Sequence, residues 1–159
     1  MKLDTRIKQA LLEINFVERY EKLSTYYSQK RTPKGQELDY FDGDFLMEIV
    51  ELLGYKAQYD KRERFFHIDL ESVEKFQFGF HFSLEYGRLE LIWVVYEGDK
   101  VVLGSPWTRY PRLMIARDYI IKQPIISDYV DFRDVMKIAF EMYEAFKQAF
   151  LKAATGDEG

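Results

Sequence analysis

A strict alternation between residues 75 and 86 constrains the fold of this chain more than any other feature. The apolar positions fall on every second residue, and they are Phe76, Phe78, Phe80, Phe82 and Leu84. Successive side chains of a β-strand point to opposite faces of the sheet, so this period places all five on one face. The segment is therefore predicted to be a strand with one face in a hydrophobic core, where all of its phenylalanines are buried.

A tight turn at Tyr86-Gly87 joins this strand to a second apolar segment, residues 89–96. In a two-residue hairpin the paired residue numbers sum to 173, so Phe80 lies opposite Trp93. The inner face is then built from aromatic cross-strand pairs. The predicted outer face is mixed in character, and it comprises Gln77, Gly79, His81, Ile92, Val94 and Tyr96, with Phe65 and His67 from the preceding strand.

Helical periodicity flanks the strands on both sides. Apolar residues recur at helical spacing over residues 4–27 and again over 45–53, and residues 135–150 carry a third apolar stripe. Short strands before the main hairpin and at residues 101–103 complete an antiparallel set. The segment 113–119 is consistent with either a helix or an irregular crossing.

These elements predict an α+β fold: an antiparallel β-meander of about five strands, with two helices before it and one long C-terminal helix after it. Asp4 or Thr5 is placed to cap the first helix, and Asp44 the second. No linker or repeat divides the chain. We therefore expect residues 1–159 to form a single domain, with residues 155–159 as a frayed tail.

Composition excludes several classes of site. The 159 residues include no cysteine, which excludes a disulfide framework, a zinc–thiolate site and a cysteine nucleophile. There are 23 basic and 27 acidic residues, for a net charge of −4. This balance disfavours nucleic acid as a partner and suits a basic protein.

The first residues of the chain carry charge at once, and no apolar stretch follows them. We therefore expect no secretory signal. The apolar runs are also far shorter than the roughly 20 residues needed to cross a bilayer. These patterns predict a cytoplasmic protein without a membrane segment.

No catalytic motif is present. The sequence Gly104-Ser105-Pro106 lacks the second glycine of a hydrolase elbow, and no glycine-rich loop suits a phosphate. His67 and His81 are the only histidines, and both alternate with ordinary strand residues. We therefore expect no metal, no cofactor and no enzymatic activity.

An acidic loop precedes the second predicted helix. It gathers Asp39, Asp42 and Asp44 beside Tyr40 and Phe41. Helix capping by Asp44 and packing of Phe41 explain half of this cluster without any ligand. Asp39, Tyr40 and Asp42 exceed that requirement, so they are predicted to form part of a protein-binding edge. A metal is the least favoured interpretation, because the loop lacks the length and final glutamate of a calcium loop.

The outer face of the sheet has two interpretations. In the favoured interpretation, a helix or the segment that begins at Trp107 partly covers this face. The alternative is an exposed aromatic surface that receives a partner through His67, His81 and Tyr96, with Trp107 and Tyr110 as further aromatic contacts.

Basic residues also cluster, at residues 30–34, 61–64 and 109–117. Interleaving with Tyr110 would suit single-stranded nucleic acid. Each group is small, and no RNA-binding motif accompanies it. Solvated loop charge is therefore the favoured interpretation.

The C-terminal third has a recognisable order of motifs. A Gly104-Ser105-Pro106-Trp107 turn is followed by residues 126–132, ISDYVDF, which lead into a final helix containing the sequence MYEAFK at 142–147. This order resembles immunity proteins of bacterial polymorphic-toxin systems, including those of contact-dependent growth inhibition. The resemblance implies an intracellular protein that binds and blocks a cognate toxin. Such families differ in fold and bind through variable surfaces, so the resemblance assigns no site residues.

The leading hypothesis is thus a non-enzymatic protein-binding domain, most plausibly an immunity protein that neutralises a basic toxin domain. One alternative is a secretion chaperone, which is also small, acidic and α+β. Another is a small-molecule-binding protein or enzyme that uses the open sheet face. In that case His67, His81, Tyr96 and Glu85 would be the acid–base groups.

Overall fold

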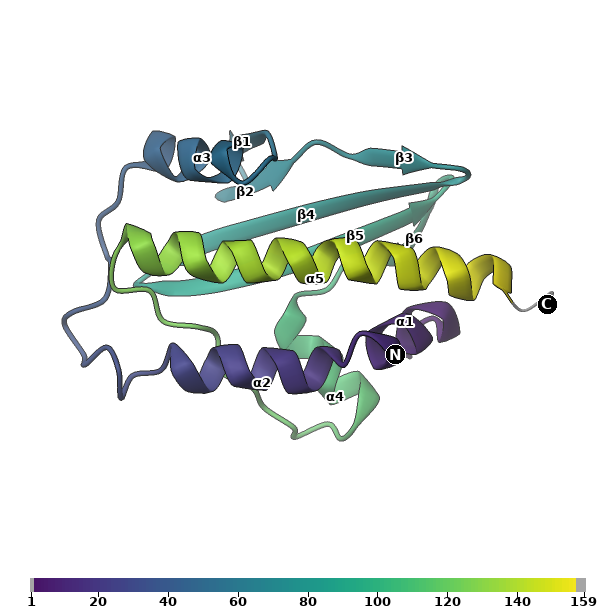
Figure 1. Cartoon of the computed structure of the whole chain (residues 1–159), viewed down its shortest axis with the longest axis horizontal. Helices are drawn as coiled ribbons and strands as arrows, with labels where there is room; N and C mark the ends of the chain where they lie inside the picture. Colours follow the sequence, from purple (N-terminus) through teal and green to yellow (C-terminus); the bar gives the residue numbers. More distant parts are fainter. Residues whose placement is uncertain (1, 157–159) are drawn as a thin grey trace.

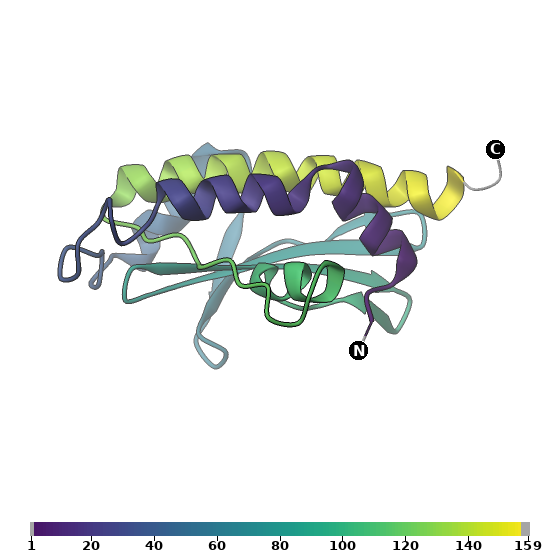
Figure 2. The same cartoon turned by 90° about the horizontal axis from the view of Figure 1, so that it is seen from below.

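The computed structural model, which describes residues 2–156, confirms the α+β fold. An antiparallel sheet of six strands is covered by helices on one of its faces (Figures 1 and 2). The long C-terminal helix α5, Tyr129–Thr155, runs along the middle of this face. Helices α1, Thr5–Glu13, and α2, Phe16–Tyr26, lie beside it.

The centre of the sheet is the predicted hairpin. Strands β4, Phe76–Glu85, and β5, Arg88–Glu97, pair along their whole length, and Phe80 lies opposite Trp93 as expected. Tyr86 and Gly87 both have positive φ, at 52° and 75°. This is the conformation of a type I′ turn, whose twist matches that of paired strands.

Four shorter strands extend this hairpin. Strands β1, Ala57–Asp60, and β2, Phe65–Ile68, add to β4 on one side, and β6, Lys100–Leu103, adds to β5 on the other. Strand β3, Glu71–Val73, pairs with β4 beyond the end of β2. The sheet order is therefore β1-β2-β4-β5-β6, which leaves β1 as an edge strand.

The first predicted helix is divided in two. Asn15 adopts a left-handed conformation with φ of 54°, which ends α1 at Glu13 and starts α2 at Phe16. Asparagine tolerates this conformation better than most residues because its short polar side chain can bond locally. The break matters because α2 carries Phe16, which is fully buried among the core aromatics.

Side-chain caps start three of the helices. Asp4 caps α1, in agreement with the prediction, and Asp128 caps α5. Helix α3, Gly43–Leu52, is capped by Asp42, whose side chain accepts a hydrogen bond from the Asp44 amide at 3.0 Å. The prediction that Asp44 is the cap was therefore wrong by two residues.

The core lies between the sheet and α1, α2, α3 and α5. The four alternating phenylalanines of β4 are buried in it, as predicted. Phe80 packs against Phe140 and Tyr143 of α5, with ring centroids 5.0 and 5.2 Å apart. Thr155 still belongs to α5, and residues 157–159 of the predicted frayed tail lie outside the described residues.

Candidate partner-binding surface

The outer face of the sheet carries no helix among the described residues. Figure 2 shows α1, α2 and α5 above the sheet, while the β1–β2 hairpin projects below it. The segment that begins at Trp107 was the favoured cover for this face. It instead forms a short 3₁₀ turn, Trp107–Arg109, and the one-and-a-half-turn helix α4, Tyr110–Met114, and both pack toward α2 and the inner face.

Two predicted contact residues are consequently excluded from this surface. Trp107 is 1% exposed and Tyr110 is 0% exposed. The Trp107 ring packs edge-on against Phe16 of α2 and Trp93 of β5, at centroid distances of 5.0 Å in both cases, so it lies between α2 and the sheet. Both side chains are core residues, so the prediction that they bind a partner was wrong.

Three other predicted residues do come together. His67, His81 and Ile92 form a row across β2, β4 and β5, because His67 pairs with His81 and His81 pairs with Ile92. Tyr96 lies on the same face of β5. The two imidazole rings are 5.9 Å apart, and Phe65 stacks on His81 with centroids 4.5 Å apart.

This face is hollowed beside the histidines. A concavity of about 350 Å³, called the outer hollow below, is lined by Asp60, Phe65, His67, Ile68, Asp69, Leu70, His81 and Tyr96. Its lining includes two carboxylates, several aromatic rings and no lysine or arginine. Leu70 lies over Gly79 on the outer face and is 50% exposed.

The histidine in the middle of the row is electrically neutral near pH 7. Burial, together with the charge of neighbouring His67, lowers the pKa of His81 to about 4, while Asp60 opposes the shift. No described residue forms a hydrogen bond to either imidazole. The rings therefore present stacking surfaces and free ring nitrogens to whatever enters the hollow.

The acidic loop forms a second surface. Tyr40 is 95% exposed, and Asp39, Asp42 and Asp44 are exposed as well. Between residues 35 and 55 the chain has six carboxylates and no lysine or arginine, and we call this stretch the acidic segment. It comprises the loop before α3 and α3 itself.

Edge strand β1 separates the two surfaces. Asp60 of β1 lines the outer hollow, whereas its neighbour Tyr59 lines a small concavity with Phe41, Asp42 and Met47 on the other face. Sequence reasoning missed the contribution of Asp60 and Asp69. The only signal for them was their position at the ends of strands that flank the histidine row.

Two further searches cover the part of the chain that the structure describes. Within residues 2–156, no three histidine, aspartate or glutamate side chains converge in a way that could hold a metal ion. Within the same range, no helix combines the length and the apolar character needed to span a membrane.

Comparison of the chain with models of protein families, with curated proteins and with solved structures finds no match in any of the three. Function is therefore inferred from the surface itself.

Proposed function

We propose that this chain is a non-enzymatic protein-binding domain, and that its partner is a basic protein. The observation that carries the proposal is the uncovered, half-buried aromatic face of the sheet, whose hollow contains two carboxylates and no cation. Uncovered apolar sheet surface of this kind is characteristic of interaction sites. We further propose that the partner is a toxin domain, so that the chain is an immunity protein.

The outer hollow has the chemistry to accept an arginine side chain. A guanidinium can stack on Phe65 or Tyr96 while it donates hydrogen bonds to Asp60 or Asp69. The histidine rings can accept hydrogen bonds from the same group, because His81 is neutral near pH 7. Aromatic and arginine pairs of this type carry much of the binding energy at protein interfaces.

The acidic segment supports the same partner in a different way. Its exposed carboxylates create a negative field beside the edge strand that borders the outer hollow. Such fields accelerate the approach of basic proteins more than they strengthen the final contacts. We therefore assign steering to the acidic segment and tight contact to the outer hollow.

A small-molecule site is the second candidate function. It is favoured by the 5.9 Å spacing of the imidazoles of His67 and His81 in a hollow that also contains Tyr96. Glu85, the fourth residue of that hypothesis, is not in the hollow and lies opposite Arg88 at the far end of β4. A His81 with pKa about 4 is also a weak base near neutrality.

A secretion chaperone is a third candidate function. It can be distinguished from an immunity protein by its oligomeric state, because a chaperone is expected to form a stable dimer in solution.

The decisive experiment uses two matched variants. Leu70→Lys introduces a cation at a 50% exposed position in the outer hollow, and Val130→Lys introduces one at a 52% exposed position on α5. Each is co-expressed with any toxin domain found encoded beside this gene, and survival of the cells is measured. We expect wild type and Val130→Lys to protect the cells and Leu70→Lys to fail while remaining folded by circular dichroism.

Other outcomes contradict different parts of the proposal. If wild type gives no protection, or if no toxin gene adjoins this one, the immunity function is wrong. If Leu70→Lys protects as well as Val130→Lys, the partner does not use the outer hollow. If purified chain binds the toxin without restoring growth, the protein-binding role stands and neutralisation does not.

A further inference from the structure

Six cationic side chains line two adjoining hollows on the surface around α4. The larger hollow, of about 770 Å³, includes Lys30, Arg88, Arg112 and Lys122 in its lining. The smaller one, of about 480 Å³, is lined by Arg109, Arg112, Leu113 and Arg117. Arg112 lines both, so the two hollows adjoin at this residue, and we call them the basic hollows.

The fold assembles this cluster from separate parts of the chain. Lys30 follows α2, Arg88 starts β5, and the remaining cations come from residues 109–122. Residues 124–126 hold these parts together, because the Ile126 amide donates to the Gly87 carbonyl at 2.7 Å and the Ile125 amide to the Tyr27 carbonyl at 2.8 Å. All six side chains are exposed, as solvated loop charge predicts, and the fold additionally gathers them around α4.

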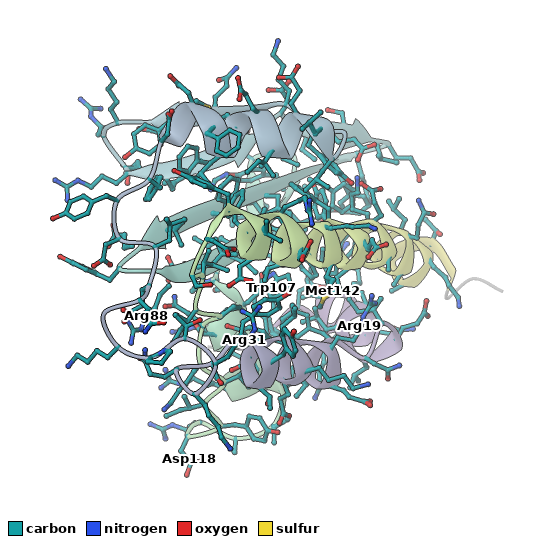
Figure 3. The ribbon with its side chains drawn as sticks, turned by 60° about the vertical axis from the view of Figure 1, so that its left-hand side comes forward. Arg19, Arg31, Arg88, Trp107, Asp118 and Met142 are labelled. Atoms are coloured by element: carbon teal, nitrogen blue, oxygen red, sulfur yellow. The ribbon has the colours of Figure 1, made fainter. Side chains whose placement is uncertain are left out.

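No carboxylate lines either hollow. None of the six cations forms an ion pair with another described residue. Glu37 and Glu90 accept hydrogen bonds at 3.4 Å from the lining residues Gln29 and Gln123 respectively, and Glu37 packs against Gly87, next to Arg88. Asp118 is the only acidic residue between 105 and 122, and in Figure 3 it extends from the lower tip of the molecule, away from Arg88. In a chain of net charge −4, a concave surface lined by six cations and no carboxylate is locally positive.

The other lining residues indicate what kind of anion would fit. Hydroxyl groups of Ser24, Ser28 and Thr108 can donate hydrogen bonds, and three isoleucines provide apolar surface: Ile120, Ile121 and Ile125. The Arg112 Nε donates to the Arg117 carbonyl at 2.8 Å, which orients the guanidinium and leaves its terminal nitrogens available. Arginine forks and hydroxyls are the donors that recognise phosphate groups.

We propose that the basic hollows bind an organic phosphate with two anionic groups, one in each hollow and Arg112 between them. The isoleucines of the larger hollow then contact the organic part of the ligand. The basic hollows share no lining residue with the outer hollow, and their ligand does not depend on the proposed protein partner. The basic hollows fit a small ligand better than a flat macromolecular contact because both are concave.

The test is calorimetric titration of the purified chain, at low ionic strength, with pyrophosphate and with ADP as probes. The variant is Arg112→Gln, and the matched control is Arg62→Gln, which removes the same charge from the exposed β1–β2 turn. We expect both probes to bind, ADP more tightly than pyrophosphate. Arg112→Gln should lower the affinity for each probe by about tenfold or more, whereas Arg62→Gln should change neither affinity by more than about twofold.

Four results would overturn the proposal. If pyrophosphate or ADP does not bind, the proposed site is wrong. Equal losses in Arg112→Gln and Arg62→Gln would mean that only the net charge of the protein matters. Equal affinities for ADP and pyrophosphate would contradict the role of the isoleucines. Tighter binding of a single-stranded oligonucleotide than of ADP would assign the hollows to nucleic acid instead.

Discussion

The Tyr110 hydroxyl takes the place of a neighbouring strand at Trp93. The Trp93 amide donates to the Tyr110 Oη at 3.4 Å, and that hydroxyl donates in turn to the Ser105 carbonyl at 2.9 Å. Strand β6 ends at Leu103, so β5 has no ladder partner here on the side away from β4, although Pro106 bridges the adjacent Ile92. An aromatic residue expected to face a partner thus completes the hydrogen bonding of the sheet.

Tyr110→Phe should therefore weaken the fold locally as well as globally. It leaves the buried Trp93 amide and Ser105 carbonyl without this partner, at a cost of about 1–3 kcal/mol in the free energy of unfolding. Urea denaturation measures that loss. Hydrogen exchange of the Trp93 amide should accelerate, and an unchanged exchange rate would show that another group satisfies the amide.

Tyr143→Phe should change the free energy of unfolding in the opposite direction, and it serves as a matched comparison. The Tyr143 hydroxyl is buried and finds no hydrogen-bond partner among the described residues. Removal of an unsatisfied buried polar group relieves its desolvation cost, so we expect the variant to be stabilised by up to about 1 kcal/mol. The same urea titration applies. A loss of stability similar to that of Tyr110→Phe would reveal a partner for this hydroxyl.

Phe80→Ala should be strongly destabilising. The ring is fully buried and packs against Trp93, Phe140 and Tyr143, so its loss leaves a cavity as well as removing buried area. We expect a decrease of about 3–5 kcal/mol in the free energy of unfolding. Tyr40→Ala, at a 95% exposed position, is the control and should stay within about 0.5 kcal/mol of wild type. A loss below about 1 kcal/mol for Phe80→Ala would contradict its place in the core.

His81 should make stability depend on pH between about 4 and 6.5. Burial lowers its pKa to about 4 in the folded chain, whereas the unfolded chain takes up the proton near pH 6.5. Between these values the unfolded state binds more protons, so the free energy of unfolding falls as pH falls. His81→Gln should reduce the difference in that free energy between pH 7 and pH 5. An equal difference in wild type and variant would place the His81 pKa near its ordinary value.

Replacement of Asp39 and Asp44 together by asparagine tests the acidic segment. Both side chains are exposed, and Asp42 keeps the cap of α3, so stability should change little. If the partner is basic, its association rate should fall, and the difference from wild type should shrink as salt rises. Stopped-flow binding measures both effects. Unchanged association at low salt would show that the loop serves only the helix.

Local sequence determined the elements of this fold that depend on neighbours in the chain. The alternation from Phe76 to Leu84 and the Tyr86-Gly87 turn specify the central hairpin and its register, because a strand has period two and a two-residue turn admits one pairing. The apolar stripe of α5 likewise predicts which of its faces is buried. That register places His81 and Tyr96 on one face, as predicted, whereas the position of His67 beside His81 depends on the separate pairing of β2 with β4.

Tertiary structure alone decided how distant segments meet. Nothing near Trp107 or Tyr110 in the chain shows that their rings pack between α2 and the sheet, since exposed and buried aromatic residues look alike in sequence. The same holds for Lys30, Arg88 and Arg112, which are far apart in sequence and share one hollow. Local propensity sets the conformation of each segment, but the burial of a side chain and the field around a charge depend on contacts that only the folded chain creates.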